Sequence, residues 1–335
     1  MPNPVIVSRT RPGNRRAISS ILLLLSLLVV LVDWSAAWLS AATLPAGFIE
    51  NEIGDTFEEF VGVTFDEAGR VYAWDRIGHI WIIENDVKQP VPFLDISPEV
   101  GAWSDYGLLG VAFHPNFRQN GYVYLLYVVD HHYLSKFGTP NYNPNANEYQ
   151  QATIGRLTRY TARSSDNFRS VDPASRLVLV GETASTGFPI MFYTHGVGTL
   201  AFGTDGSLLA SCGDGAALTD YGSSAESYYS QALNEGIIRP KENIGAFRSQ
   251  LVDCMSGKIL RLDPATGNGL PSNPFYDSAA PRSARSRVFA LGLRNPYRIC
   301  LRPGTGSTVQ AISSGVLWVV REGSGLRFSL KRAIT

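Results

Sequence analysis

A repeated unit of two apolar segments joined by a glycine-containing turn constrains the fold of this chain more than any other feature. It occurs in "VTFDEAGRVYAWD", "VAFHPNFRQNGYVYLLY" and "LAFGTDGSLLASC", where the first apolar segment ends at Phe65, Phe113 and Phe202. Phe113 follows Phe65 by 48 residues and Phe202 follows Phe113 by 89, as if one unit between them lacked the signature. A spacing of about 40–50 residues with several strands per unit is typical of β-propeller blades.

The stretch "FVGVTFDEAGRVYAWDRIGHIWIIE", residues 60–84, shows the pattern in detail. Its apolar segments are rich in Val, Ile, Tyr and Trp and are separated by the short turns "DEAG" and "RIG". This predicts three antiparallel strands with tight connections. A parallel α/β fold would need helical patterns of about 10–15 residues between strands, and the sequence has none. We therefore expect an all-β fold.

The length of the chain limits the number of blades. Residues 43–335 would supply roughly six bare blades of about 45 residues. Two long polar insertions, 131–151 and 213–245, reduce the expected number to four to five blades. Such insertions commonly lie on one face of a scaffold and carry the ligand site. Strand character returns in 256–264 and 286–304.

The N-terminus has the three-part pattern of a secretory signal. An apolar core at 21–32 is followed by the small residues "SAA" at 40–42. The basic residues before the core are Arg9, Arg11, Arg15 and Arg16. We expect residues 1–42 to be a signal peptide and the protein to be secreted or periplasmic, with no membrane contact after cleavage. A membrane anchor is the alternative, although a spanning helix needs about 20 apolar residues and Asp33 ends this run.

Charge and cysteine content narrow the function. Lys+Arg and Asp+Glu both number 29, and the net charge is zero. A neutral chain with no basic run in its body is a poor nucleic-acid binder. The cysteines, Cys212, Cys254 and Cys300, fit no zinc-site spacing. Either one pair forms a disulfide and leaves one thiol, or all three are small buried residues.

Five stretches between residues 44 and 307 resemble the glucose/sorbosone dehydrogenases, soluble quinoprotein sugar dehydrogenases related to the hedgehog-interacting-protein-like proteins. The stretches are "LPAGF" (44–48), "GLLGVAFHPNFRQNGYVYLLY" (107–127), "HGVGTLAFGTDGSLLASCGDG" (195–215), "SGKILRLDPATGNGLPSNPFY" (256–276) and "ALGLRNPYR" (290–298). The resemblance implies a six-bladed β-propeller, of which this chain would hold an incomplete set in residues 43–307. It also implies pyrroloquinoline quinone (PQQ), usually with Ca²⁺, as the cofactor.

The resemblance also implies the roles of three residues. His195 matches the histidine that removes the proton from a sugar or alcohol hydroxyl, and Arg294 and Asn295 match an Arg–Asn pair that contacts the quinone oxygens. An external acceptor then takes up the electrons. The chemistry agrees, because a neutral imidazole is a suitable base near neutral pH. A guanidinium and an amide can stabilise negative charge that develops on an oxygen.

The chain departs from the family pattern in three places. Two of these departures, the lost Gln and the absent calcium loop, favour an alternative, a non-catalytic propeller that binds a protein or a glycan. Tyr106 stands where the family usually has Gln, and "GVG" at 196–198 replaces Asn-Gly-Gly. The resemblance ends near residue 307, and the tail 308–335 lacks the family's calcium loop. A frameshift or mis-spliced gene would explain this tail, so we leave the metal ligands unassigned and expect reduced activity from the chain as it stands.

The remaining candidates have simpler interpretations. "GDG" at 213–215 is interpreted as a turn, because Asp214 alone is too few ligands for Ca²⁺. His131 and His132 are expected to be solvated loop residues. His79 and His114 lie next to turns, where the sequence shows no partner for either.

Overall fold

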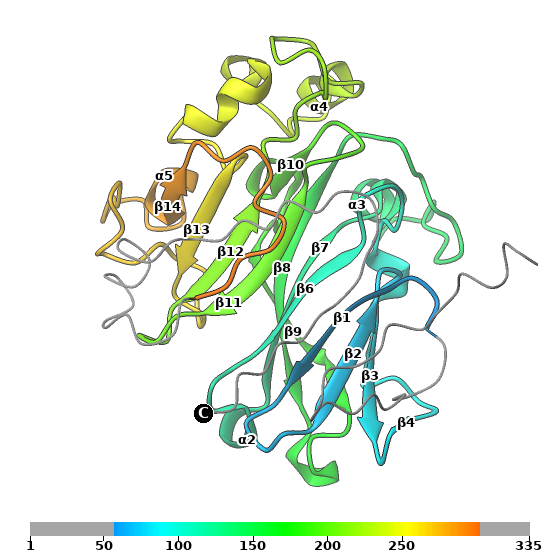
Figure 1. Ribbon diagram of the computed structural model, residues 1–335. Helices are drawn as coiled ribbons and strands as arrows, with labels where there is room; N and C mark the ends of the chain where they lie inside the picture. The colour runs from blue at the N-terminus through cyan, green and yellow to red at the C-terminus, as the bar shows by residue number, and fades with distance from the viewer. Residues whose placement is uncertain (1–56, 302–335) are drawn as a thin grey trace, which may run out of the picture. The chain divides into compact units, whose positions relative to one another are not determined.

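The computed structural model describes residues 57–301, which belong to one of the chain's two compact units, Ile53–Thr335 (Figure 1). The predicted signal peptide and the tail 308–335 lie outside the described residues. The first sheet contains β1 (Phe60–Phe65), β2 (Val71–Asp75), β3 (His79–Glu84), β4 (Val87–Lys88) and β5 (Leu94–Asp95). The second contains β6 (Leu108–Phe113), β7 (Tyr122–Val128), β8 (Thr153–Ala162), β9 (Val171–Val180) and β10 (Phe188–Ile190). The third contains β11 (Val197–Phe202), β12 (Leu208–Cys212), β13 (Lys258–Leu262) and β14 (Val288–Leu291).

Short helices occupy the connections. The α-helices are α2 (Phe117–Asn120), α3 (His131–Lys136), α4 (Tyr229–Asn234) and α5 (Ala284–Arg287). The 3₁₀ helices are η1 (Ser97–Glu99), η2 (Ser164–Asp166), η3 (Ala184–Thr186), η4 (Pro240–Glu242) and η5 (Gly245–Gln250). The polar insertions expected at 131–151 and 213–245 are thus partly helical, since they contain α3 and α4.

All strand pairs within the three sheets are antiparallel. The main orders are β1-β2-β3-β4, β10-β8-β7-β6 and β11-β12-β13-β14, with β5 beside β3 and β9 beside β8. Successive antiparallel sheets of this kind are the blades of a β-propeller. The expected all-β propeller fold is therefore confirmed, and so is the meander over residues 60–84.

The three signature phenylalanines have equivalent positions. Phe65, Phe113 and Phe202 each end the first strand of a sheet, namely β1, β6 and β11. The interpretation of the 89-residue interval is wrong, however. One five-stranded sheet fills it, because β8 and β9 are each 10 residues long and an insertion precedes β8. Three sheets occupy residues 57–301, and the expected count of four to five blades is not confirmed.

The sheets pack through their apolar faces. One buried cluster joins the first and second sheets, and another joins the second and third. β6 has all six residues buried and contacts both β1 and β11, so the first strands of the three sheets are neighbours. Gly110 permits this approach, because a Cβ there would lie 3.1 Å from the backbone nitrogen of Leu200 in β11.

Two sets of minor predictions need correction. Cys212 and Cys254 are buried free thiols and Cys300 is an exposed one, so neither cysteine interpretation holds as a whole. His131 and His132 are not solvated loop residues, because they begin α3 and both contact Glu148.

The two histidines beside turns also have partners. His79 Nδ1 lies 2.8 Å from Asp75 Oδ2, and this contact is the main cause of a raised pKa of His79. His114 Nδ1 accepts a hydrogen bond from the backbone N–H of Asn116.

The turn between β11 and β12 offers a test of stability against pH. Burial alone would raise the pKa of Asp205, but hydrogen bonds from Ser207 and Arg261 outweigh burial and lower it to about 2. A depressed pKa stabilises the folded state above the unfolded value of about 3.9, and this contribution is lost as the pH falls through the folded value. Asp205→Asn should therefore lower the free energy of unfolding by about 1–2 kcal/mol at pH 7, after allowance for solvent screening. In urea titrations the difference from wild type should narrow between pH 4 and pH 2, and a difference independent of pH would contradict the assignment.

Candidate active site

His195, Asp214 and Arg294 meet at one end of the third sheet, where its strand pairing continues past the strands themselves. The backbone N–H of Gly215 donates to the carbonyl of His195 at 3.0 Å, and the N–H of Asp214 donates to the carbonyl of Arg294 at 2.9 Å. His195 precedes β11, Asp214 follows β12 and Arg294 follows β14. The register of the sheet thus brings Asp214 together with His195, which lies 19 positions before it, and with Arg294, which lies 80 positions after it.

Asp214 is the centre of the site. Its carboxylate is 1% exposed, and Oδ1 lies 3.3 Å from Nδ1 of His195. Nη1 of Arg294 lies 2.7 Å from both carboxylate oxygens. The backbone N–H of Ala216 donates to Oδ1 at 3.0 Å. A single buried carboxylate therefore holds the imidazole and the guanidinium in fixed positions.

The protonation of this group follows from its contacts. Burial is the largest influence and opposes ionisation of Asp214, but hydrogen bonds from His195, Arg294 and the Ala216 N–H outweigh it and lower the pKa of Asp214. The ionised carboxylate only accepts hydrogen bonds. His195 Nδ1 must therefore carry a proton toward Asp214, which leaves the lone pair of the neutral ring on Nε2.

Arg294 is held on two further sides. Nη2 donates to the carbonyl of Ala217 at 2.7 Å, and the guanidinium carbon lies 5.0 Å from the centre of the Tyr221 ring. The Arg294 side chain remains 37% exposed, so this fixed group is accessible from solvent. Asn295 is partly exposed, and its side chain extends over Gly213.

Two small backbone positions make this packing possible. A Cβ on Gly213 would lie 2.4 Å from the carbonyl oxygen of His195 and 3.0 Å from Oδ1 of Asn295. His195 itself has φ of 63°, a left-handed conformation that costs energy in a residue other than glycine. Gly196 allows the ring of Tyr106 to pack against the backbone, where a Cβ would lie 2.6 Å from it.

Tyr106 has a structural role at this site. It is fully buried, and its hydroxyl donates to the backbone carbonyls of Phe192 and Thr194. The tyrosine therefore supports the segment that leads into His195. It presents no polar group to a ligand, whereas the glutamine expected from the family pattern would.

The polar groups of His195, Arg294 and Asn295 fit one part of the cofactor that the resemblance implies. Imidazole Nε2, the Arg294 guanidinium and the Asn295 amide are groups that fit a carbinol and the quinone oxygens beside it. Arg294 does not fit the three carboxylates of PQQ, because Asp214 already neutralises its positive charge. The described residues thus fit the quinone end of the cofactor and leave the carboxylate end unassigned. Residues 57–301 contain no group of three or more His, Cys, Asp or Glu side chains able to hold a metal ion.

Asp214 is the residue that sequence reasoning missed. The structure brings together His195, Arg294 and Asn295 as a set, but the turn interpretation of "GDG" gave the aspartate no role. The usable signal was its position directly after an apolar strand that pairs with the segment beginning at His195. An aspartate between two glycines at such a strand end can contact side chains at the ends of the adjacent strands.

The comparisons with known proteins identify the family of this chain and its fold. Residues 57–311 match the sequence model of the family described as Glucose / Sorbosone dehydrogenase. The HIPL1 protein of Arabidopsis thaliana is 27% identical over 247 residues, covering 64% of this chain and 30% of its own length. The HIPL2 protein of the same plant is 26% identical over 262 residues, covering 70% of this chain and 34% of its own length.

Among solved structures, a glucose dehydrogenase-type oxidoreductase from Thermus thermophilus aligns with a TM-score of 0.51 and 23% identity. The alignment covers 76% of this chain and 57% of that one, and it shows a shared fold. The chain spans about a third of the length of the two plant relatives that it matches. Because the family match covers most of the chain, this protein belongs to the glucose/sorbosone dehydrogenase family.

Proposed function

We propose that this protein oxidises a sugar or an alcohol with PQQ as cofactor, and that an external acceptor then takes up the electrons. The observation that carries the proposal is the buried Asp214 carboxylate, which holds His195 and Arg294 at one strand end of a family propeller. PQQ, when bound, supplies the two-electron acceptor for the hydride. Export by the N-terminal signal and a Ca²⁺ requirement are parts of the same proposal.

His195 is the proposed base. Its Nε2 would accept the proton of the substrate hydroxyl while the carbon that bears this hydroxyl gives up a hydride to the two-electron acceptor. The substrate becomes a carbonyl compound, the acceptor holds the hydride and His195 becomes an imidazolium. Asp214 holds Nδ1–H in place and stabilises the imidazolium once it forms. Such a positioned base typically contributes about 10²–10⁴-fold to the rate.

Arg294 and Asn295 are the proposed groups for the acceptor oxygens. The Arg294 guanidinium is preorganised by Asp214 and Ala217, and little reorganisation is needed when negative charge develops on a neighbouring oxygen. The Asn295 amide can donate a second hydrogen bond to the same region.

The test is a titration of the purified chain with PQQ in the presence of Ca²⁺, followed by visible absorbance and a glucose-plus-dye assay. We expect saturable binding and dye reduction. His195→Ala should keep the binding and reduce the turnover by about 10²–10⁴-fold, the typical contribution of a positioned base. Unchanged turnover in His195→Ala would refute the assigned base.

A non-catalytic propeller that binds a protein or a glycan is the second candidate. The buried Tyr106 favours it, because the site around His195 then lacks the polar side chain expected at position 106. Absence of PQQ binding, both by this chain and by a chimera extended with the C-terminal half of a family member, would support this candidate. Binding only by the chimera would show that the cofactor site needs residues that this chain does not supply.

A further inference from the structure

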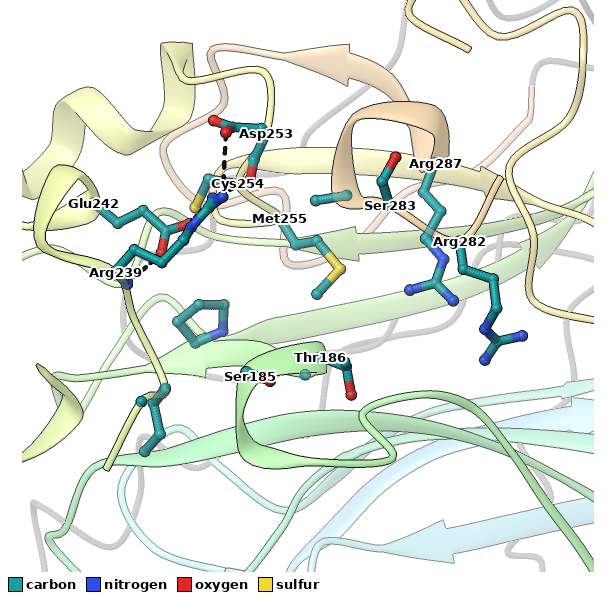
Figure 2. Close-up of a pocket in the computed structure, with 15 residues that line it drawn as sticks. Ser185, Thr186, Arg239, Glu242, Asp253, Cys254, Met255, Arg282, Ser283 and Arg287 are labelled. Carbon is teal, nitrogen blue, oxygen red and sulfur yellow. Dashed lines mark hydrogen bonds and ion pairs between the residues drawn. The ribbon is translucent and has the colours of Figure 1, made fainter. Parts of the chain in front are cut away.

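A cavity of about 310 Å³ lies between the second and third sheets, apart from the site above. Thr186 of η3 lines one side of it, Arg282 and Arg287 lie at one end and Arg239 at the other, and Met255 lies between them (Figure 2). His195, Asp214 and Arg294 do not line it. Its volume falls in the range of small-molecule pockets.

Arg287 is the unusual group in this cavity. The residue is only 2% exposed, yet no carboxylate among residues 57–301 forms an ion pair with it. Nε donates to the carbonyl of Gly267 at 2.8 Å and Nη2 to the carbonyl of Leu179 at 3.0 Å. Within the described part of the chain nothing accepts a hydrogen bond from Nη1, which leaves this atom for the cavity.

The neighbouring charges do not compensate Arg287. Arg282 also donates to the carbonyl of Leu179, so the two guanidinium groups are close together, as Figure 2 shows. Arg282 is paired with Glu182. At the far end of the cavity Arg239 is paired with Glu242 and Asp253.

One positive charge is therefore left over in a buried position. Burial and the adjacent Arg282 lower the pKa of Arg287 to about 10, but the group remains a cation at neutral pH. A buried charge without a counter-ion is strongly unfavourable. A guanidinium with free N–H groups has the geometry to bind an oxyanion.

Hydroxyl groups complete the lining. Thr186 and Ser185 come from η3, and Ser283 precedes α5. The Thr186 hydroxyl donates to the carbonyl of Thr183 at 3.2 Å and the Ser283 hydroxyl donates to the carbonyl of Ala280 at 2.8 Å, so the O–H groups of these two residues are already used. The principal donor left for a ligand is the Arg287 guanidinium, and the two carboxylates of the lining, Glu242 and Asp253, are both paired with Arg239, so the cavity suits a small oxyanion.

We propose that this cavity is a binding site for a small oxyanion, a carboxylate or a phosphate, with the Arg287 guanidinium as its principal ligand. The anion neutralises the buried charge and ties η3 of the second sheet to α5 of the third. Binding of this anion is independent of the proposed dehydrogenase chemistry, since none of the proposed catalytic groups takes part in it.

The test uses the full chain and two probes, sodium phosphate and sodium malonate, with sodium chloride at equal ionic strength as the reference. Calorimetry and thermal unfolding should show saturable binding and a raised midpoint for at least one probe. The tighter probe assigns the anion as phosphate or carboxylate. The proposal would be overturned if neither probe gave a response larger than that to chloride. The same result would be obtained if a carboxylate of the chain itself occupied the cavity.

Variants connect the binding to Arg287. Arg287→Gln should weaken the binding at least about tenfold, as expected for loss of a charge-assisted hydrogen bond. Arg285→Gln is the matched control, since it removes the same charge from an exposed position of α5 and should bind as wild type. If Arg287→Gln does not fold, Arg287→Lys keeps the charge but loses the fork geometry, and it should also bind more weakly. Wild-type affinity in a folded Arg287 variant would refute the site.

Discussion

Asp214→Asn is expected to reduce the turnover of the PQQ-loaded protein by about 10³-fold, somewhat less than the roughly 10⁴-fold loss when the orienting aspartate of a Ser-His-Asp triad is replaced. The amide can donate a hydrogen bond where the carboxylate only accepts. His195 can then place its proton on Nε2, which removes the lone pair needed for the substrate hydroxyl. The variant also removes the charge that holds Arg294. The measurement is kcat in the dye assay, beside the affinity for PQQ.

A second readout separates positioning from general damage to the fold. Nitrogen-15 spectra of the histidine rings should show the His195 proton on Nδ1 in wild type and a changed tautomer in Asp214→Asn. Asp220→Asn, an exposed aspartate of the same insertion, is the control and should match wild type in both assays. Unaltered turnover and tautomer in Asp214→Asn would show that the carboxylate does not orient the imidazole.

Arg248→Met should lower the free energy of unfolding by about 3–5 kcal/mol, the usual effect of removing one partner from a buried ion pair. Arg248 and Glu226 both have 0% side-chain exposure, and Nη2 of the arginine lies 2.7 Å from Oε1 of the glutamate. Arg248 also donates to the backbone carbonyls of Glu242 and Asp214. Its loss would leave a buried, uncompensated carboxylate and would free the segment that carries Asp214.

Two further variants test the physical cause of this effect by urea unfolding. Arg248→Met combined with Glu226→Leu should recover much of the lost stability, because no charge is then left buried alone. Lys241→Met breaks an exposed ion pair with Asp253 in the same region and should change stability by less than about 1 kcal/mol. Equal losses in Arg248→Met and Lys241→Met would contradict the role of burial.

Much of the fold could be predicted because it depends on local patterns. The apolar segment ending in phenylalanine, followed by a glycine-containing turn, recurs wherever a sheet begins, and Phe65, Phe113 and Phe202 occupy the same position in β1, β6 and β11. The pattern of apolar residues and the choice of turn residues act over a few positions, so both can be recognised directly in the sequence. The number of sheets between Phe113 and Phe202 could not be predicted, because the lengths of β8 and β9 depend on how these strands pair with each other and with β7.

The candidate site shows the same division. His195, Arg294 and Asn295 could be named from motifs, each of which is short and continuous. Asp214 could not, because an isolated Gly-Asp-Gly stretch predicts a turn equally well. Its importance arises only when the register of the third sheet places it between His195 and Arg294.

The sequence by itself therefore determined the all-β class, the sheet starts and the motif residues, since local apolar patterning and turns suffice for these. Only the tertiary structure decided which carboxylate holds the base, which arginine is buried without a counter-ion, and that the three thiols are free. The physical reason is that burial and charge pairing depend on distances between segments far apart in the chain. Asp214 and Arg294, 80 residues apart, meet only after β13 has paired with β12 and β14 with β13.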